Sequence, residues 1–148
     1  MTKTAGFTLI ELMIVTAIMA TLASLAVPTL MTYRDRSRVT QVVGSSEVIR
    51  AAFASYAASS PGNAYPLTGA ITDFNSLRLV VNIHGGRLPS TAIFTVNSYD
   101  FYDSDGDGVA DTYSMRLSVI GVTSSVTGSQ ILLTPEGIFK CTSSGTPC

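Results

Sequence analysis

Five of the ten acidic residues lie within residues 100–111, with a spacing that favours binding of a metal cation. Residues 103–111 read Asp-Ser-Asp-Gly-Asp-Gly-Val-Ala-Asp, which fits the first nine positions of an EF-hand-type calcium loop. Gly108 occupies the position of the sharp turn. Carboxylates at this spacing repel one another unless a cation lies among them. We therefore expect a structural Ca²⁺ whose ligands are Asp103, Asp105, Asp107, the backbone carbonyl of Val109, and Asp111.

The loop departs from the EF-hand pattern at its end. Position twelve is Ser114, where a bidentate Glu is usual, and the flanking residues favour strands rather than helices. We expect modest affinity, in the range of about 10⁻⁴–10⁻³ M that extracellular modules show. The alternative is an acidic turn that serves solubility alone.

An apolar run over residues 7–31 contains a single acidic side chain. The chain is 46% hydrophobic and only 13% charged, and Glu11 is the only charged residue between Thr4 and Tyr33. The run is longer than the roughly 20 residues that a membrane-spanning helix needs, and too long for a cleaved signal peptide. A carboxylate within such a helix costs roughly 2.5–3.5 kcal/mol, which makes Glu11 a candidate functional residue. The local alternative is a capping box between Thr8 and Glu11.

Residues 6–12, which read Gly-Phe-Thr-Leu-Ile-Glu-Leu, resemble the processing site of type IV prepilins and of type II secretion pseudopilins. The resemblance implies a leader, residues 1–6, that a prepilin peptidase removes by cutting after Gly6. It also implies N-methylation of the new terminus, Phe7. The subunit would then reside in the inner membrane until it assembles into an extracellular filament or a periplasmic pseudopilus.

The same resemblance implies assembly roles for Phe7, Glu11 and Pro28. In a filament, the Glu11 carboxylate of an entering subunit can neutralise the Phe7 amine of its neighbour, which would fix the register of the two chains. Pro28 removes the helix hydrogen bond to the carbonyl of Ser24, so we expect a kink or a loosened turn there. Many pilins carry a proline at the corresponding position.

Two signals disagree on the orientation in the membrane. Three arginines at residues 34–38 outweigh Lys3 and the initiator amine, so the positive-inside rule predicts a cytoplasmic C-terminal part. The prepilin resemblance predicts the reverse. We follow the processing motif, because Asp35 moderates the cluster and the two cysteines favour an oxidising compartment. A reporter fused after Arg38 would decide between them.

The remaining sequence predicts an α+β fold. Residues 32–60 continue the helix with an amphipathic period that ends at a Ser-Ser-Pro-Gly sequence, and residues 61–148 form a β-rich head domain. We expect an antiparallel sheet of about four strands packed against the helix, which the resemblance identifies as pilin-like. The predicted strands are 77–83, 92–96, 113–122, 131–134 and 138–141.

Cys141 and Cys148 are the only cysteines. A pair this close could bind a metal only with help from elsewhere, and His84 is the only histidine. In a translocated domain a disulfide is expected, and it would form a short C-terminal loop. Many pilins are similar in having a C-terminal disulfide loop.

The sequence favours a structural role over an enzymatic one. It contains no Gly-rich phosphate loop, no zinc-ligand spacing and no G-x-S-x-G sequence, and its scattered basic residues predict no general nucleic-acid binding. We expect a pilus-like filament subunit that polymerises with identical or related subunits. The alternatives are a type II secretion pseudopilin, and a membrane-anchored, calcium-dependent binding module that does not polymerise.

Overall fold

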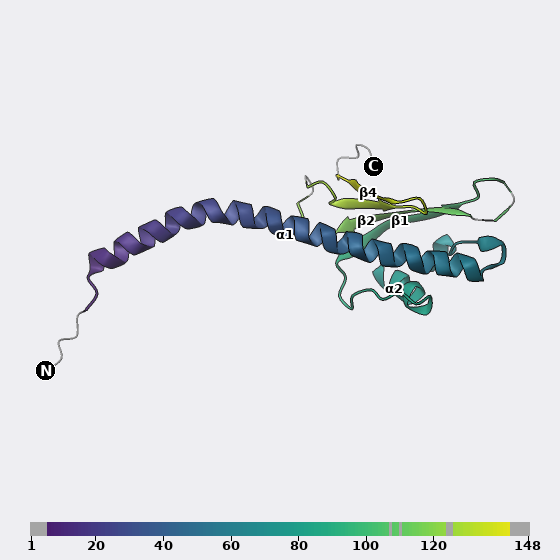
Figure 1. The fold of residues 1–148 in the computed structure, drawn as a ribbon, viewed down its shortest axis with the longest axis horizontal. Coiled ribbons are helices and arrows are strands. Elements are labelled where there is room, and N and C mark those ends of the chain that lie inside the picture. The colour runs from purple at the N-terminus through teal and green to yellow at the C-terminus, as the bar shows by residue number, and fades with distance from the viewer. Residues whose placement is uncertain (1–5, 107, 110, 124–125, 143–148) are drawn as a thin grey trace. The chain divides into compact units, whose positions relative to one another are not determined.

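The structure is a computed structural model that describes residues 6–106, 108–109, 111–123 and 126–142. It divides into two compact units, Met1–Arg34 and Asp35–Cys148. One helix, α1 (Leu9–Ser59), contributes residues to both units (Figure 1). We describe the two units separately.

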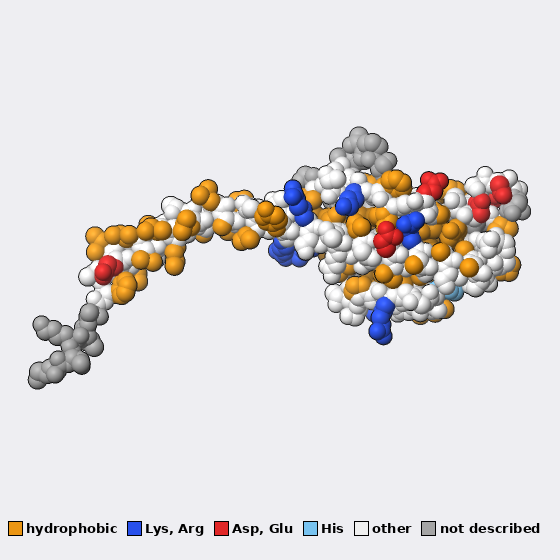
Figure 2. Space-filling view, in the orientation of Figure 1, with side chains coloured by type: hydrophobic (Ala, Val, Ile, Leu, Met, Phe, Trp, Pro, Cys, Tyr) orange, Lys and Arg blue, Asp and Glu red, His pale blue; other side chains and the backbone are white. Residues whose placement is uncertain are grey.

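The described part of the first unit comprises the apolar half of α1 and the three residues before it, residues 6–8. All described side chains of this unit are exposed, and α1 is the helix among the described residues that is long and apolar enough to cross a membrane. Figure 2 shows hydrophobic side chains along this half of α1. Its hydroxyl groups donate to carbonyls three or four residues earlier, so they add no unpaired donors to an apolar surface. These hydroxyls belong to Thr16, Thr21, Ser24, Thr29 and Thr32.

The second unit contains a four-stranded antiparallel sheet in the order β1-β2-β3-β4. The strands are β1 (Phe94–Tyr102), β2 (Thr112–Val119), β3 (Gln130–Leu133) and β4 (Ile138–Cys141). Burial alternates along β2 and β3, as expected for strands with one face in the core. The long helix followed by this sheet confirms the predicted α+β, pilin-like architecture.

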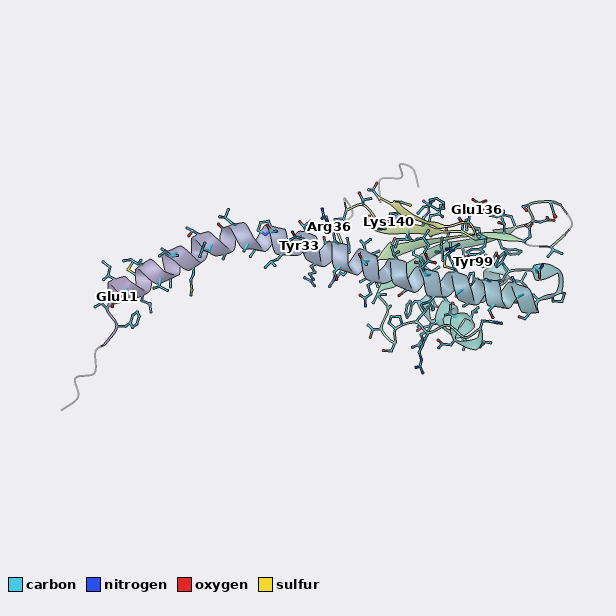
Figure 3. The ribbon with its side chains drawn as sticks, in the orientation of Figure 1. Glu11, Tyr33, Arg36, Tyr99, Glu136 and Lys140 are labelled. Atoms are coloured by element: carbon cyan, nitrogen blue, oxygen red, sulfur yellow. The ribbon has the colours of Figure 1, made fainter. Side chains whose placement is uncertain are left out.

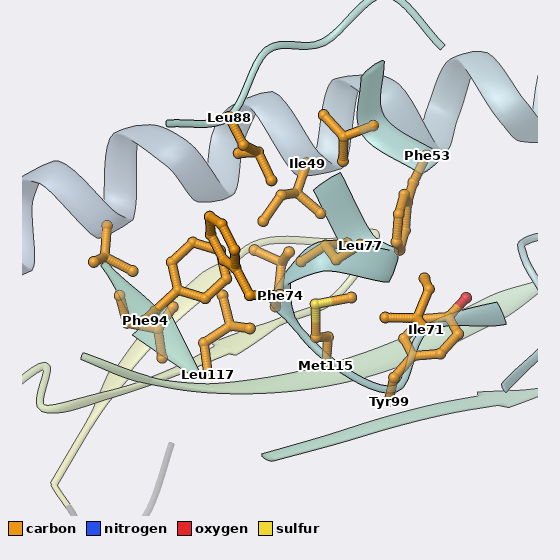
Figure 4. Packing of buried hydrophobic residues seen from close by; sticks show 14 of the residues in the cluster. Ile49, Phe53, Ile71, Phe74, Leu77, Leu88, Phe94, Tyr99, Met115 and Leu117 are labelled. Atoms are coloured by element: carbon orange, nitrogen blue, oxygen red, sulfur yellow. The ribbon is translucent and has the colours of Figure 1, made fainter. Parts of the chain in front are cut away.

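The second half of α1 packs its apolar stripe into the core of this unit. Buried side chains recur every three or four residues along it, as one face of a helix requires. Figure 4 shows this stripe meeting side chains of α2 (Phe74–Ile83) and of the sheet. The buried residues of α1 are Val39, Val42, Ser46, Ile49, Ala52, Phe53 and Ala57.

An aromatic group forms one end of the core. The ring of Phe53 meets those of Tyr99 and Tyr113 edge to face, at centroid distances of 5.8 and 5.1 Å. The Tyr99 hydroxyl donates to the carbonyl of Pro66 at 2.6 Å. Burial raises the pKa of both tyrosines well above the ordinary value, so their hydroxyls stay neutral.

The strand predicted at residues 77–83 is wrong, because this segment belongs to the helix α2. Asp73 and Ser76 form a reciprocal capping box, in which the Asp73 carboxylate accepts from the Ser76 amide at 2.7 Å. At the other end, Gly85 has a φ of +83° and the Gly86 amide donates to the carbonyl of Val81. These end signals and the burial of one helix face outweigh the strand preference of the β-branched residues, so the segment is helical.

The other predicted strands occur, three of them with shifted ends. β1 begins two residues later than predicted and continues to Tyr102, and a register shift between Val96 and Ser98 interrupts its pairing with β2. β2 ends at Val119 rather than at Val122, and β4 has the predicted bounds. The alternation of apolar residues indicates that a strand is present. The turn residues indicate the ends of that strand less precisely.

Candidate functional site

The start of α1 carries a reciprocal hydrogen-bonded cap. The Glu11 carboxylate accepts from the Thr8 amide at 2.9 Å and from the Thr8 hydroxyl at 2.8 Å, and the Glu11 amide donates to the Thr8 hydroxyl oxygen at 3.3 Å. Figure 3 shows Glu11 in the first turn of α1. The capping box that the sequence left as an alternative therefore exists in this structure. An assembly role for Glu11 requires a second subunit and stays a prediction.

The predicted cleavage site lies in the exposed segment that precedes the helix. Gly6 and Phe7 are both exposed and lie outside α1, and the Phe7 side chain is 79% exposed. A methyl group placed on Gly6 would meet no atom within 4 Å. The bond between Gly6 and Phe7 thus lies outside the helix α1, and its cleavage stays a prediction. The other leader residues, 1–5, lie outside the described residues.

Pro28 lies inside α1, which continues through it as a helix. The Pro28 carbonyl accepts a hydrogen bond from the Thr32 hydroxyl at 3.2 Å. Because proline has no amide hydrogen, the carbonyl of Ser24 has no backbone donor at this turn. The turn around Pro28 is therefore the weakest point of backbone bonding in the apolar half.

The acidic loop between β1 and β2 folds around its first carboxylate. Asp103 accepts from the backbone amides of Asp105, Gly106 and Gly108, at 3.2, 2.6 and 2.7 Å. Gly108 has a φ of +86°, which agrees with the sharp turn expected at this position. The described residues of the loop therefore turn around the Asp103 carboxylate, and the calcium-loop assignment stays a prediction.

Asp111 closes the loop from its other end. Its carboxylate accepts from the Ser104 amide at 2.8 Å and from the Ser104 hydroxyl. The amides of Gly108 and Gly106 lower the pKa of Asp103, and the Ser104 hydroxyl and amide lower the pKa of Asp111. Both carboxylates therefore stay ionised at neutral pH, as a ligand of a hard cation must be.

The loop also contacts the turn that follows α1. A methyl group on Gly62, whose φ is +70°, would come within 3.0 Å of the Val109 side chain. Asp107 lies outside the described residues, and no group of three or more His, Cys, Asp or Glu side chains that could hold a metal occurs within them. The donor set of acidic oxygens fits Ca²⁺ chemically, and its occupancy stays a prediction.

Cys141 is buried at the end of β4, with 4% of its surface exposed. Cys148 lies outside the described residues, so the pairing of the two cysteines also stays a prediction.

Two arginines have structural roles that the sequence did not reveal. The Arg38 Nη1 donates to the carbonyls of Ile120 and Gly121 at 3.3 and 2.6 Å, and the Arg50 Nη2 donates to the carbonyl of Pro135 at 2.8 Å. These bonds hold the β2–β3 and β3–β4 loops against α1. In sequence, Arg38 has the appearance of a membrane-boundary charge, and no local signal points to partners more than 80 residues away.

The fold and the N-terminal segment define a protein of pilin-like architecture, with a long helix that is apolar in its first half and a sheet domain after it. Residues 1–27 match the family model described as the prokaryotic N-terminal methylation motif. The chain therefore carries the prepilin-type motif of type IV pilins and pseudopilins. Neither the curated proteins nor the solved structures include a significant match to the chain.

Proposed function

We propose that this chain is a structural subunit of a type IV pilus-like filament. A prepilin peptidase cuts it after Gly6, Phe7 is N-methylated, and the subunits polymerise through the helix over residues 7–31. The observation that carries the proposal is the methylation motif at residues 1–27, which includes the start of a helix long and apolar enough to cross a membrane. Such an apolar helix needs either lipid or other copies of the same helix.

The proposal places the subunit in the inner membrane first and in an extracellular filament afterwards. A helix whose side-chain hydroxyls bond to its own carbonyls, and whose backbone bonds are interrupted only at Pro28, can reside in lipid and later exchange lipid for neighbouring helices. The protein is not proposed to be an enzyme, because the family of its N-terminal motif is structural.

The acidic loop favours a second candidate. If the chain belongs to a type II secretion system, the polymer would be a short periplasmic pseudopilus rather than a surface filament. The exported head would meet millimolar Ca²⁺ in either case. Genes for a pilus retraction motor beside this one would favour the pilus, and genes for a secretion gate would favour the pseudopilus.

Mass spectrometry of filaments sheared from the cell surface tests the proposal. We expect a mature chain that begins at Phe7, carries one N-terminal methyl group and weighs two hydrogens less than its reduced form. The last difference corresponds to the proposed disulfide between Cys141 and Cys148, which by the chain-entropy model stabilises the folded state by about 2.5 kcal/mol because it constrains the unfolded chain. A chain that retains residues 1–6 in the cell envelope, with no filaments, would contradict the proposal.

We further propose that the acidic loop binds Ca²⁺ through Asp103, Asp105, Asp107, Val109 and Asp111. Calorimetric titration of the full chain in detergent should give a dissociation constant of about 10⁻⁴–10⁻³ M. Asp103→Asn, which keeps the size of the side chain and removes its charge, should weaken binding at least about tenfold because it deletes an anionic ligand. Asp100→Asn is the matched control, since Asp100 lies in β1 and outside the ligand set.

The same titration has a predicted pH dependence. The pKa of Asp103 and of Asp111 is below the ordinary aspartate value in the folded chain. The hydrogen bonds to these carboxylates therefore stabilise the fold fully at pH values above the ordinary aspartate pKa. The stabilisation disappears as the pH falls through the lowered pKa. Calcium affinity should therefore be unchanged between pH 7 and pH 5 and should fall at more acidic pH. Absence of uptake at millimolar Ca²⁺ would remove the site.

A further inference from the structure

The outward face of α2 exposes two large aliphatic side chains. Leu79 is 63% exposed and Ile83 is 68% exposed, and they lie one turn apart on the helix. The buried residues of α2 lie on its opposite face. Among the described residues of the second unit, no large hydrophobic side chain is more exposed than Ile83. A helix that is only ten residues long and otherwise well capped thus leaves an apolar surface without a partner.

Two arginines without an ion pair among the described residues lie close in sequence to this apolar pair: Arg78 precedes Leu79 directly, and Arg87 follows Ile83 by four residues. Arg78 on α2 and Arg87 just after it form no ion pair, because the ion pair found among the described residues joins Arg50 to Glu47. No acidic residue occurs over residues 74–99. We call the set Arg78, Leu79, Ile83 and Arg87 the α2 patch.

The following stretch of the chain has the opposite character. Residues 100–111 hold five aspartates and no basic residue. Tyr102, which immediately precedes the acidic loop, is 48% exposed, and Asp100 and Asp105 are exposed as well. We call Asp100, Tyr102 and Asp105 the acidic patch. Even with a divalent cation bound, five aspartates leave this end of the unit negative.

The two patches belong to different surfaces of the second unit. In Figure 2 acidic side chains gather at the end of this unit that carries the β1–β2 loop, and a basic side chain projects from the side that carries α2. The two patches are therefore complementary in charge, and each offers an exposed apolar group to the other. A contact between them must join two different surfaces of two copies.

We propose that the α2 patch of one copy binds the acidic patch of a second copy of this chain. Leu79 and Ile83 would pack against the Tyr102 ring, and the arginines would face the aspartates around it. This inference rests on the proposed filament and adds to it the contact between neighbouring head domains. Because the contact joins unlike surfaces, its repetition gives a ring if the rotation between neighbours closes and an open helical chain if it does not, and the proposed filament requires the open form.

The charged side chains and the apolar side chains contribute differently to this contact. The opposite potentials favour the correct orientation and oppose pairing of two α2 patches or of two acidic patches. The aliphatic pair and the tyrosine ring supply the area that excludes water, and aromatic residues are common centres of such contacts. We assign a second copy of this chain as the partner of the α2 patch because the chain itself carries a surface of opposite charge, the acidic patch.

Cross-linking in intact filaments tests the contact. The full chain with Ile83→Cys and Tyr102→Cys is expressed in the producing cells, and a short bismaleimide is added to the assembled filaments. We expect a ladder of covalent dimers, trimers and higher species from the double variant. Each single variant should give no ladder. The matched control combines Ile83→Cys with Phe139→Cys, because Phe139 is 42% exposed on β4, and it should also give none.

Charge reversal gives a second measurement. Arg78→Glu with Arg87→Glu should lower the yield of sheared filaments at least about tenfold, because like charges then face each other. Arg116→Glu, at an exposed position of β2, should leave the yield unchanged. Normal filaments without a ladder from the double cysteine variant would overturn the head contact and leave the proposed function intact. Absence of filaments from the unmodified chain would instead overturn the proposed function.

Discussion

Replacing Glu11 by alanine should abolish filament assembly while the chain still inserts into the membrane. In the proposed filament the Glu11 carboxylate faces the Phe7 amine of a neighbouring subunit, away from water. Removing one partner of such a buried charge pair costs about 2–5 kcal/mol per contact, much of it from the amine that is left unpaired. Insertion should improve slightly, since the variant carries no carboxylate into lipid. Membrane fractionation and counts of sheared filaments check the two expectations together.

The cap that Glu11 forms with Thr8 makes a control necessary. Because both side chains take part in the same hydrogen bonds, Glu11→Ala also removes the cap of α1. Thr8→Ala removes the hydroxyl of that cap and keeps the charge, at a cost of about 0.5–2 kcal/mol to the helix end. Glu11→Gln keeps a hydrogen-bonding side chain and loses the charge.

The three variants separate a local role from an assembly role. If the charge fixes the register between subunits, Thr8→Ala assembles and both Glu11 variants fail. If Glu11 serves only as a cap, Thr8→Ala is as defective as Glu11→Ala, and Glu11→Gln assembles. In the uncleaved chain no amine of a neighbouring subunit is available to Glu11. The cap then supplies its carboxylate with two hydrogen-bond donors, the amide and the hydroxyl of Thr8.

The parts of the fold that the sequence predicted correctly are those with a regular local pattern. The apolar stripe from Val39 to Ala57 follows the helical period, and the alternation of Met115, Leu117 and Val119 follows the strand period. α2 was missed because Leu79, Val80 and Val81 are as common in strands as in buried helices. The signal that could have found α2 is the pair of Asp73 and Ser76 three residues apart, which is an N-terminal capping pattern.

The candidate sites divide in the same way. The turn around Asp103 follows from the glycine and aspartate spacing, since each bond spans five residues or fewer. The contacts of Arg38 with Gly121, and of Arg50 with Pro135, join residues more than 80 positions apart. Such contacts depend on how the sheet and α1 meet, and a single sequence contains no local record of them. The exposure of Leu79 and Ile83 likewise depends on which face of α2 packs against the core, and the sequence alone does not show that face.

Replacing Phe53 by alanine should destabilise the second unit by about 3–5 kcal/mol, a large share of the roughly 5–15 kcal/mol that stabilises a typical domain. The Phe53 side chain is fully buried, and its ring meets Tyr99 and Tyr113 edge to face. Removing it leaves a cavity between α1 and the sheet, and it deletes two aromatic contacts. Urea unfolding of the full chain in detergent, followed by tyrosine fluorescence, measures the loss.

The control is a phenylalanine on the surface of the same unit. Phe139→Ala should cost less than about 1 kcal/mol, because Phe139 is 42% exposed and its removal opens no cavity. Phe53→Leu should retain most of the stability, since leucine fills much of the same volume. A Phe53→Ala variant that unfolds at the same urea concentration as Phe139→Ala would mean that α1 does not supply the core.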